Sequence, residues 1–142
     1  MTDKFNLTIR GSTHTNLTKR ELAYQVFAEA IRRGITLDRL RKVITSKSPN
    51  RAFVSVPGRL NEREFIKEAT RIRAESGHSF NTIKWFSAGA KLIYAEGQTV
   101  AFTNQWGHST VEMVSLMKKE MKGQDISFEL AGPFSDTIGG KL

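Results

Sequence analysis

The segment Thr18–Ile44, TKRELAYQVFAEAIRRGITLDRLRKVI, carries the clearest helical pattern of the 142-residue chain. Thr18 and Glu21 have the spacing of a capping box, in which each side chain satisfies a backbone donor at the start of a helix. Apolar side chains then recur every three or four residues, and Gly34 follows where a helix commonly ends in the left-handed conformation. The pattern predicts a helix over residues 19–33.

A second helix is predicted to follow at once, with Thr36 as its N-cap and Leu37, Leu40 and Val43 on its inward side. Two helices joined across the short connection Gly34-Ile35 resemble the start of a helix-turn-helix unit. The outward positions of the second helix are basic, and the loop after it carries further Lys and Arg. This pair is the first candidate for a binding surface.

Strands become frequent after residue 52, each bounded by Gly, Pro or a capping residue. The predicted elements are a strand at 52–56, a helix capped by Asn61 and Glu64 and ended by Gly77, a strand at 83–86, a hairpin of 92–95 and 99–103 around Glu96-Gly97, a helix capped by Ser109 and Glu112 and closed by Gly123, and a strand at 125–130. We therefore expect a single α+β domain over residues 1–132. Its basic helical pair would pack on a mixed sheet with βαββαβ-like, or ferredoxin-like, element order, and residues 133–142 would form a flexible C-terminal tail.

Composition excludes several kinds of chemistry. The chain has no cysteine, so disulfides, thiolate metal sites and a thiol nucleophile are excluded. No phosphate-binding loop or serine-nucleophile motif occurs, and the three histidines lack metal-ligand spacing and are expected to be exposed. Apolar runs are too short to span a bilayer. We expect a cytoplasmic protein that is not an enzyme, needs no cofactor or metal and does not act at a membrane.

The net charge of +8 is unevenly distributed along the chain. Residues 1–80 hold 16 basic and 8 acidic side chains, whereas residues 81–142 hold 6 of each. All eleven arginines lie between Arg10 and Arg73, and the planar guanidinium group matches the geometry of phosphate. A solvated, solubilising surface is one interpretation, and a polyanion-binding face on the N-terminal half is the sharper one.

The sequence predicts two sets of contacts to nucleic acid. The phosphate-binding candidates are the basic and polar residues of the first three helices and the loop after the second: Arg32, Arg33, Arg39, Arg41, Lys42, Lys47, Asn50, Arg51, Arg71 and Arg73. The candidates for reading a base are Asn104, Gln105 and Trp106, because amides pair with adenine edges and an exposed Trp can stack on an unpaired base. The alternative for this second set is that the amides tie down a turn while the Trp fills the core.

The run Gly97–Gly107, GQTVAFTNQWG, resembles a hairpin-then-helix ending found on DNA-associated restriction and defence proteins. It covers a small part of the chain. The resemblance implies a DNA-recognition module attached to a nuclease or working beside one, and it assigns no catalytic residue.

DNA binding is the function that these observations favour, in a restriction, defence or other DNA-processing system. A structured-RNA-binding protein is the first alternative. A non-catalytic subunit whose basic face meets an acidic protein partner is the second. The sequence does not predict an oligomeric state.

Overall fold

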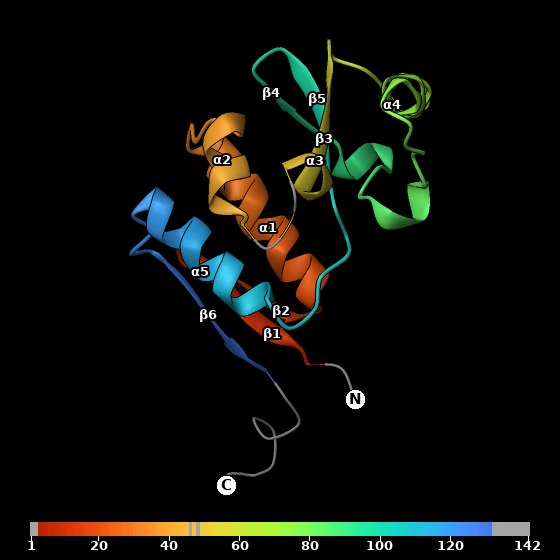
Figure 1. The fold of residues 1–142 in the computed structure, drawn as a ribbon. Helices are drawn as coiled ribbons and strands as arrows, with labels where there is room; N and C mark the ends of the chain where they lie inside the picture. The colour runs from red at the N-terminus through yellow and green to blue at the C-terminus, as the bar shows by residue number, and fades with distance from the viewer. Residues whose placement is uncertain (1–2, 46, 48, 132–142) are drawn as a thin grey trace, which may run out of the picture. The chain divides into compact units, whose positions relative to one another are not determined.

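The computed structural model describes residues 3–45, 47 and 49–131, which form a mixed α+β protein as predicted (Figure 1). The expected C-terminal tail, 133–142, lies outside the described residues. The chain divides into two compact units, one made of Met1–Arg33 with Trp106–Leu142 and the other of Gly34–Gln105. The prediction of a single domain over 1–132 stays a prediction.

The first unit combines an antiparallel sheet with two helices. Its strands are β1 (Phe5–Ile9), β2 (Ser12–Leu17) and β6 (Ile126–Leu130), in the order β2-β1-β6, and its helices are α1 (Lys19–Arg32) and α5 (Thr110–Met121). Helices α1 and α5 pack on each other (Figure 1). Strand β1 and both helices supply fully buried side chains, among them Leu7, Phe27 and Met117. The few polar side chains that are buried among the described residues all have hydrogen-bond partners.

The hairpin of β1 and β2 is absent from the sequence prediction. Its turn is Arg10-Gly11, both in the left-handed region at φ 51° and 84°, which is the requirement of a two-residue hairpin turn. Strand β2 is exposed along most of its length, so its sequence STHTNL shows no alternation of apolar and polar residues. Without that alternation the strand gives no periodic signal.

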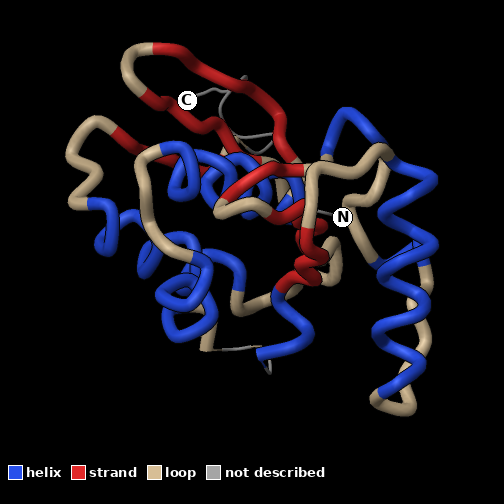
Figure 2. The backbone as a smooth tube through the Cα atoms, turned by 90° about the horizontal axis from the view of Figure 1, so that it is seen from above, coloured by secondary structure: helices blue, strands red, loops and turns tan. Residues whose placement is uncertain are grey.

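The second unit is built around a smaller antiparallel sheet. Its strands β3 (Phe53–Pro57), β4 (Ile93–Ala95) and β5 (Gln98–Phe102) pair in the order β3-β5-β4. The helical segments of this unit are α2 (Leu37–Val43), α3 (Pro49–Ala52), α4 (Glu62–Glu75) and the 3-10 turns η1 (Thr82–Lys84) and η2 (Gly89–Lys91). Helix α4, seen end-on in Figure 1, is seen lengthwise in Figure 2.

An aromatic cluster forms the core beside α4. Phe65 meets the edge of Phe80 at 5.8 Å between ring centroids, and Phe80 stacks on Trp85 at the same distance. Leu60, which precedes the N-cap, packs against this cluster as expected for a hydrophobic staple. Through Phe80, the cluster joins the start of α4 to Trp85, which directly follows the 3-10 turn η1.

The capping predictions for three helices are confirmed. Thr18 with Glu21 and Asn61 with Glu64 form complete capping boxes, and the Thr36 hydroxyl accepts the backbone N–H of Arg39. The predicted hairpin is also present, with Glu96 and Gly97 at positive φ in its turn. These local signals are reliable because each depends on residues only a few positions apart.

Two predictions about the later elements are wrong. Residues 83–86 are not a strand: Asn81 caps the turn η1, and only a single bridge joins Trp85 to Thr103. The Ser109 side chain makes no capping hydrogen bond, because its backbone is already helical at φ −85° and ψ −1°.

The left-handed residue after α5 is Lys122, not Gly123. Gly123 is nevertheless constrained, since an added Cβ would lie 2.7 Å from Cδ1 of the buried Ile126.

The sheets also differ from the prediction, because both are antiparallel rather than mixed. Strand β6 pairs with β1, whereas β3, β4 and β5 pair among themselves. The strands after residue 52 therefore do not form one split sheet, and the ferredoxin-like arrangement is not confirmed. The helix-turn-helix arrangement of α1 and α2 is likewise not confirmed, since the boundary between the two units falls at Gly34.

Within the described part of the chain, no helix is long and apolar enough to cross a membrane.

Candidate functional site: a basic cleft in residues 34–105

Two adjoining hollows form a cleft in the second unit. The smaller has a volume of about 250 Å³ and the larger about 660 Å³, and they share Arg51, Arg73 and His78 as lining residues. Arg41 lines only the smaller hollow, whereas Lys47 and Lys84 line only the larger. Five cationic side chains thus converge on one continuous depression, which we call the basic cleft.

Each cation of the basic cleft comes from a different local element. Arg41 lies in the last turn of α2, and Lys47 lies in the connection that follows it. Arg51 belongs to the short helix α3, Arg73 to the last turn of α4, and Lys84 to the turn η1. The convergence is therefore a product of the tertiary fold rather than of one basic helix face.

Arg41 is held against the start of β3. Its guanidinium carbon lies 4.2 Å from the centre of the Phe53 ring, and Nη2 donates to the Ser55 hydroxyl at 3.2 Å. An acidic neighbour is the exposed Asp38, at 4.0 Å. Stacking on an aromatic face fixes the plane of a guanidinium, so Arg41 is pre-oriented at the cleft.

Arg73 is similarly pre-oriented, by backbone and by an indole. Its Nε donates to the carbonyl of Ser79 at 2.8 Å, and its guanidinium carbon lies 5.4 Å from the Trp85 ring centre. Burial lowers the pKa of Arg73 from its ordinary value, and the nearby positive charge of Arg51 lowers it further. The two guanidinium groups therefore repel each other in the absence of an anion.

Lys47 is also partly withdrawn from water. Its Nζ donates to the backbone carbonyl of Gln105, and burial lowers the pKa of the ammonium group. Both direct causes of a lowered cationic pKa, burial and like charge, thus occur in this cleft. An anion placed among these groups would counter both.

The described residues that line the two hollows include no Asp or Glu. Their other polar members are Ser55, Ser76, Ser79, Asn81, Thr103 and Gln105. A concave surface with charges of one sign focuses the field and raises the local concentration of counter-ions. The arrangement can bind a polyanion, and its guanidinium groups suit phosphate oxygens.

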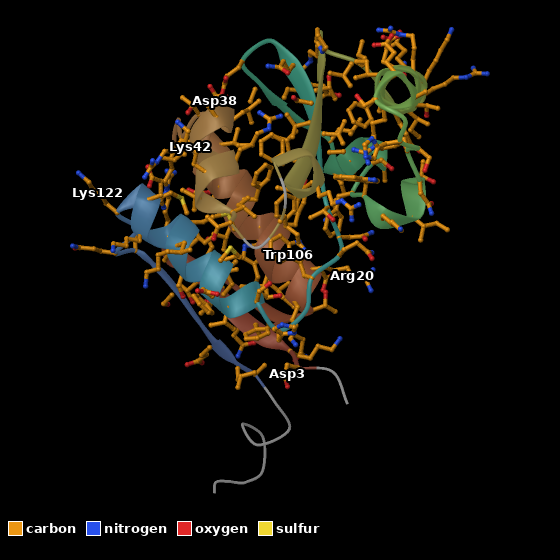
Figure 3. The ribbon with its side chains drawn as sticks, viewed as in Figure 1. Asp3, Arg20, Asp38, Lys42, Trp106 and Lys122 are labelled. Atoms are coloured by element: carbon orange, nitrogen blue, oxygen red, sulfur yellow. The ribbon has the colours of Figure 1, made fainter. Side chains whose placement is uncertain are left out.

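The predicted phosphate-binding residues divide into those that reach this cleft and those that do not. Arg41, Lys47, Arg51 and Arg73 line it. Arg39 and Lys42 are exposed on α2 but do not line either hollow, and Figure 3 marks Lys42 on that helix. Asn50 lies in α3, and its side chain is outside the described part of the structure.

Arg71 and Arg73 show how helical periodicity separates close neighbours. Arg71 binds Glu68 and Glu75 on the exposed face of α4, at 2.9 Å and 2.8 Å. Hydrogen bonds and the charges of these acids raise its pKa. Two residues along a helix turn the side chain by about 200°, so only Arg73 reaches the cleft.

Arg32 and Arg33 belong to an ion-pair network in the first unit. Glu29, only 1% exposed, pairs with Arg32, with Arg33 at 2.7 Å and with Arg10 at 3.5 Å. Arg33 also makes a two-pronged pair with Asp125 at 3.0 Å and 2.7 Å, which raises the pKa of the guanidinium. These contacts tie the end of α1 to the residue before β6.

The amides of the predicted base-reading residues are used inside the protein. Asn104 donates through Nδ2 to the carbonyl of Ile83 at 2.8 Å, and its Oδ1 accepts from Gln105 Nε2 at 2.8 Å. This is the turn-fixing alternative for both amides. Trp106 is half-buried and belongs to the first unit (Figure 3).

Sequence reasoning missed Lys84 and His78 as cleft residues. Lys84 lies in the turn η1, inside the expected strand 83–86, and His78 follows the turn that ends α4. The signal of the capped turn is Asn81, because an Asn side chain can accept a hydrogen bond from the backbone N–H two residues on; its Oδ1 accepts from the N–H of Ile83 at 3.1 Å. His78 is exposed, as expected, beside the turn glycine Gly77.

No group of three or more described His, Asp or Glu residues could hold a metal ion. Comparison of the chain with protein-family models, with curated proteins and with solved structures found no match.

Proposed function

We propose that this protein binds nucleic acid, DNA in preference to RNA, through phosphate contacts in the basic cleft. The observation that carries the proposal is the convergence of five cations from separate elements on a depression lined by no described acid. Phosphate contacts supply most of the non-specific affinity of proteins for DNA. The proposal includes no catalytic step.

The state of the individual cations supports this assignment over a merely solvated surface. Arg41 and Arg73 are oriented by aromatic rings, and Lys47 and Arg73 have lowered pKa values from burial. A solubilising surface needs neither orientation nor burial of its charges, because exposed cations are hydrated equally well in many conformations. Ordered and partly buried cations with shifted pKa values are instead typical of functional sites.

The resemblance of Gly97–Gly107 to endings of restriction and defence proteins supports a place in a DNA-processing system. In that setting the protein would act beside a nuclease partner. Gln105 lines the larger hollow, and its amide is bonded to that of Asn104, so specificity for bases would require their release from each other.

A charge-matched pair of double variants tests the proposal. Arg51→Ala/Lys84→Ala removes one Arg and one Lys from the cleft, whereas Arg63→Ala/Lys67→Ala removes the same charges from exposed sites outside it. At low salt, the cleft variant should lose about a hundredfold in affinity for duplex DNA and the control variant less than about threefold. Fluorescence anisotropy measures both.

The same titration with single-stranded DNA and duplex RNA ranks the possible ligands. Tighter binding of duplex RNA than of either DNA would replace DNA with structured RNA as the ligand. Absence of binding to all three at low salt would contradict the proposal and favour an acidic protein partner.

A further inference from the structure

The smaller hollow of the basic cleft differs in chemistry from the larger. Its cations are three guanidinium groups, those of Arg41, Arg51 and Arg73, and the side chain of His78 also lines it. Its apolar lining residues are Phe53, Val54 and Ile72, of which Phe53 and Val54 are buried. The lining of the smaller hollow therefore combines three arginines with apolar side chains.

The larger hollow is lined by a more dispersed set of groups. Besides the shared Arg51 and Arg73, its cations are the ammonium groups of Lys47 and Lys84. Hydroxyl and amide side chains occupy most of the remaining lining. Ammonium groups act as point charges and accept phosphates in many orientations, whereas guanidinium groups bind phosphate oxygens in pairs.

Charge distinguishes the end of a nucleic-acid strand from its interior. A phosphate monoester carries about −1.5 to −2 at neutral pH, whereas each internal phosphodiester carries a single negative charge. Three guanidinium groups beside apolar side chains favour the more highly charged phosphate, because a low local dielectric strengthens each ion pair.

Size points in the same direction. A volume of about 250 Å³ equals the space of roughly eight water molecules. Such a space accepts a phosphate with its sugar. The larger hollow, which shares Arg51, Arg73 and His78 with it, continues the path for adjoining nucleotides.

We infer that the smaller hollow binds the terminal phosphate of a nucleic-acid strand, with the neighbouring nucleotides lying along the larger hollow. This inference rests on the proposed function. It assigns Arg41 and Ser76, which line only the smaller hollow, to the strand end, and Lys47 and Lys84 to the strand interior.

The test compares single strands of one sequence that carry a 5′-phosphate, a 3′-phosphate or neither. Anisotropy of an internal label measures the dissociation constants at one ionic strength. One of the phosphorylated strands should bind about tenfold more tightly than the unphosphorylated strand, which corresponds to about 1.4 kcal/mol. Inorganic phosphate should compete with this preference.

Two pairs of variants assign the preference to the smaller hollow. Arg41→Gln should abolish the preference for the phosphorylated strand, whereas Lys84→Gln should weaken binding of all three strands by the same factor. Because Arg41 also packs on Phe53, a second pair avoids the core: Ser76→Asp, with Ser79→Asp as its control in the larger hollow. Ser76→Asp should remove the preference and Ser79→Asp should keep it.

The outcomes separate this inference from the proposed function. Equal, salt-dependent binding of all three strands would overturn the terminal-phosphate inference and leave nucleic-acid binding intact. Binding of a free mononucleotide as tightly as the phosphorylated strand would also overturn it, because the ligand would then be the nucleotide. Absence of binding by every strand at low salt would overturn the proposed function itself.

Discussion

The two units of this protein use arginine in opposite ways. In the first unit, Arg32 and Arg33 meet the buried carboxylate of Glu29, and Arg33 also meets Asp125. In the second unit, Arg51 and Arg73 line a cleft whose described lining includes no acid. The sequence places similar arginines in both units. The acids that the fold places beside Arg32 and Arg33 give them a structural role, whereas the proposed function assigns Arg51 and Arg73 to a ligand.

The number of basic residues in a stretch of sequence therefore overestimates how many of them lie on one binding surface. Arg71 and Arg73 are two residues apart, yet Arg71 is paired with acids on its own helix and Arg73 lines the cleft. Removal of a structural arginine or its acid should cost stability. Removal of a cleft arginine should cost affinity, and the following predictions separate the two.

The largest expected effect is on the stability of the first unit. Glu29→Gln removes the negative charge that pairs with three arginines and leaves Arg33, 16% exposed, without its charged partner on α1. Breaking a buried ion pair from one side costs about 3 kcal/mol of unfolding free energy. Urea unfolding measures the change.

Glu75→Gln is the control, since Glu75 pairs with Arg71 on an exposed helix face. Its cost should stay below about 0.5 kcal/mol. Equal costs for the two variants would show that the network around Glu29 is not a stabilising one.

A smaller effect, on affinity alone, is expected in the cleft. Arg51→Ala should reduce affinity for duplex DNA by about tenfold while the unfolding free energy changes by less than about 0.5 kcal/mol. The reason is that Arg51 contributes charge to the cleft and repels Arg73 in the free protein. A variant that loses stability and keeps affinity would place Arg51 with the structural arginines.

Helix capping gives an effect of about 1 kcal/mol that should differ between two helices of the first unit. Thr18→Ala removes a side chain that accepts from Glu21 N at 3.2 Å. Ser109→Ala removes a side chain that makes no capping hydrogen bond. Thermal unfolding should therefore detect the first substitution and not the second, and the reverse order would contradict the capping geometry.

The smallest expected effect is on the pH dependence of the stability of the first unit. Arg33 lowers the pKa of Asp125, so the carboxylate is more acidic in the folded than in the unfolded chain. A lowered folded pKa adds stability above the unfolded value of about 3.9, and this stability is lost as the pH falls through the folded pKa. The gap in melting temperature between the protein and Asp125→Asn should thus shrink on acidification.

A constant gap in melting temperature from neutral to acidic pH would contradict the role of Asp125 as the charged partner of Arg33.

Local signals in the sequence predicted much of the fold. Both capping boxes, the Thr36 cap and the Glu96-Gly97 turn depend on residues that are neighbours in the chain, and all are present. The β1–β2 hairpin was not predictable from alternation, because β2 is exposed on both faces. The pairing of β6 with β1 joins the two ends of the chain, and no local pattern encodes such a partner.

The sequence predicted that arginines form the candidate site, but not where in the fold these arginines meet. Arginine bias pointed to Arg41, Arg51 and Arg73 as well as to Arg33, and only tertiary contacts separate them. Lys84 lay outside the basic half and inside an expected strand. Its position in the cleft follows from the capped turn η1, which no strand pattern would reveal.

The salt dependence of duplex DNA binding tests the central claim most directly. Each phosphate contact adds about 0.9 to the slope of log K against log salt concentration. Arg51→Ala/Lys84→Ala should therefore reduce the magnitude of the slope by about 2, whereas Arg63→Ala/Lys67→Ala should leave it unchanged within about 0.5. Equal slopes for the two variants would contradict the assignment of the basic cleft as the phosphate-binding surface.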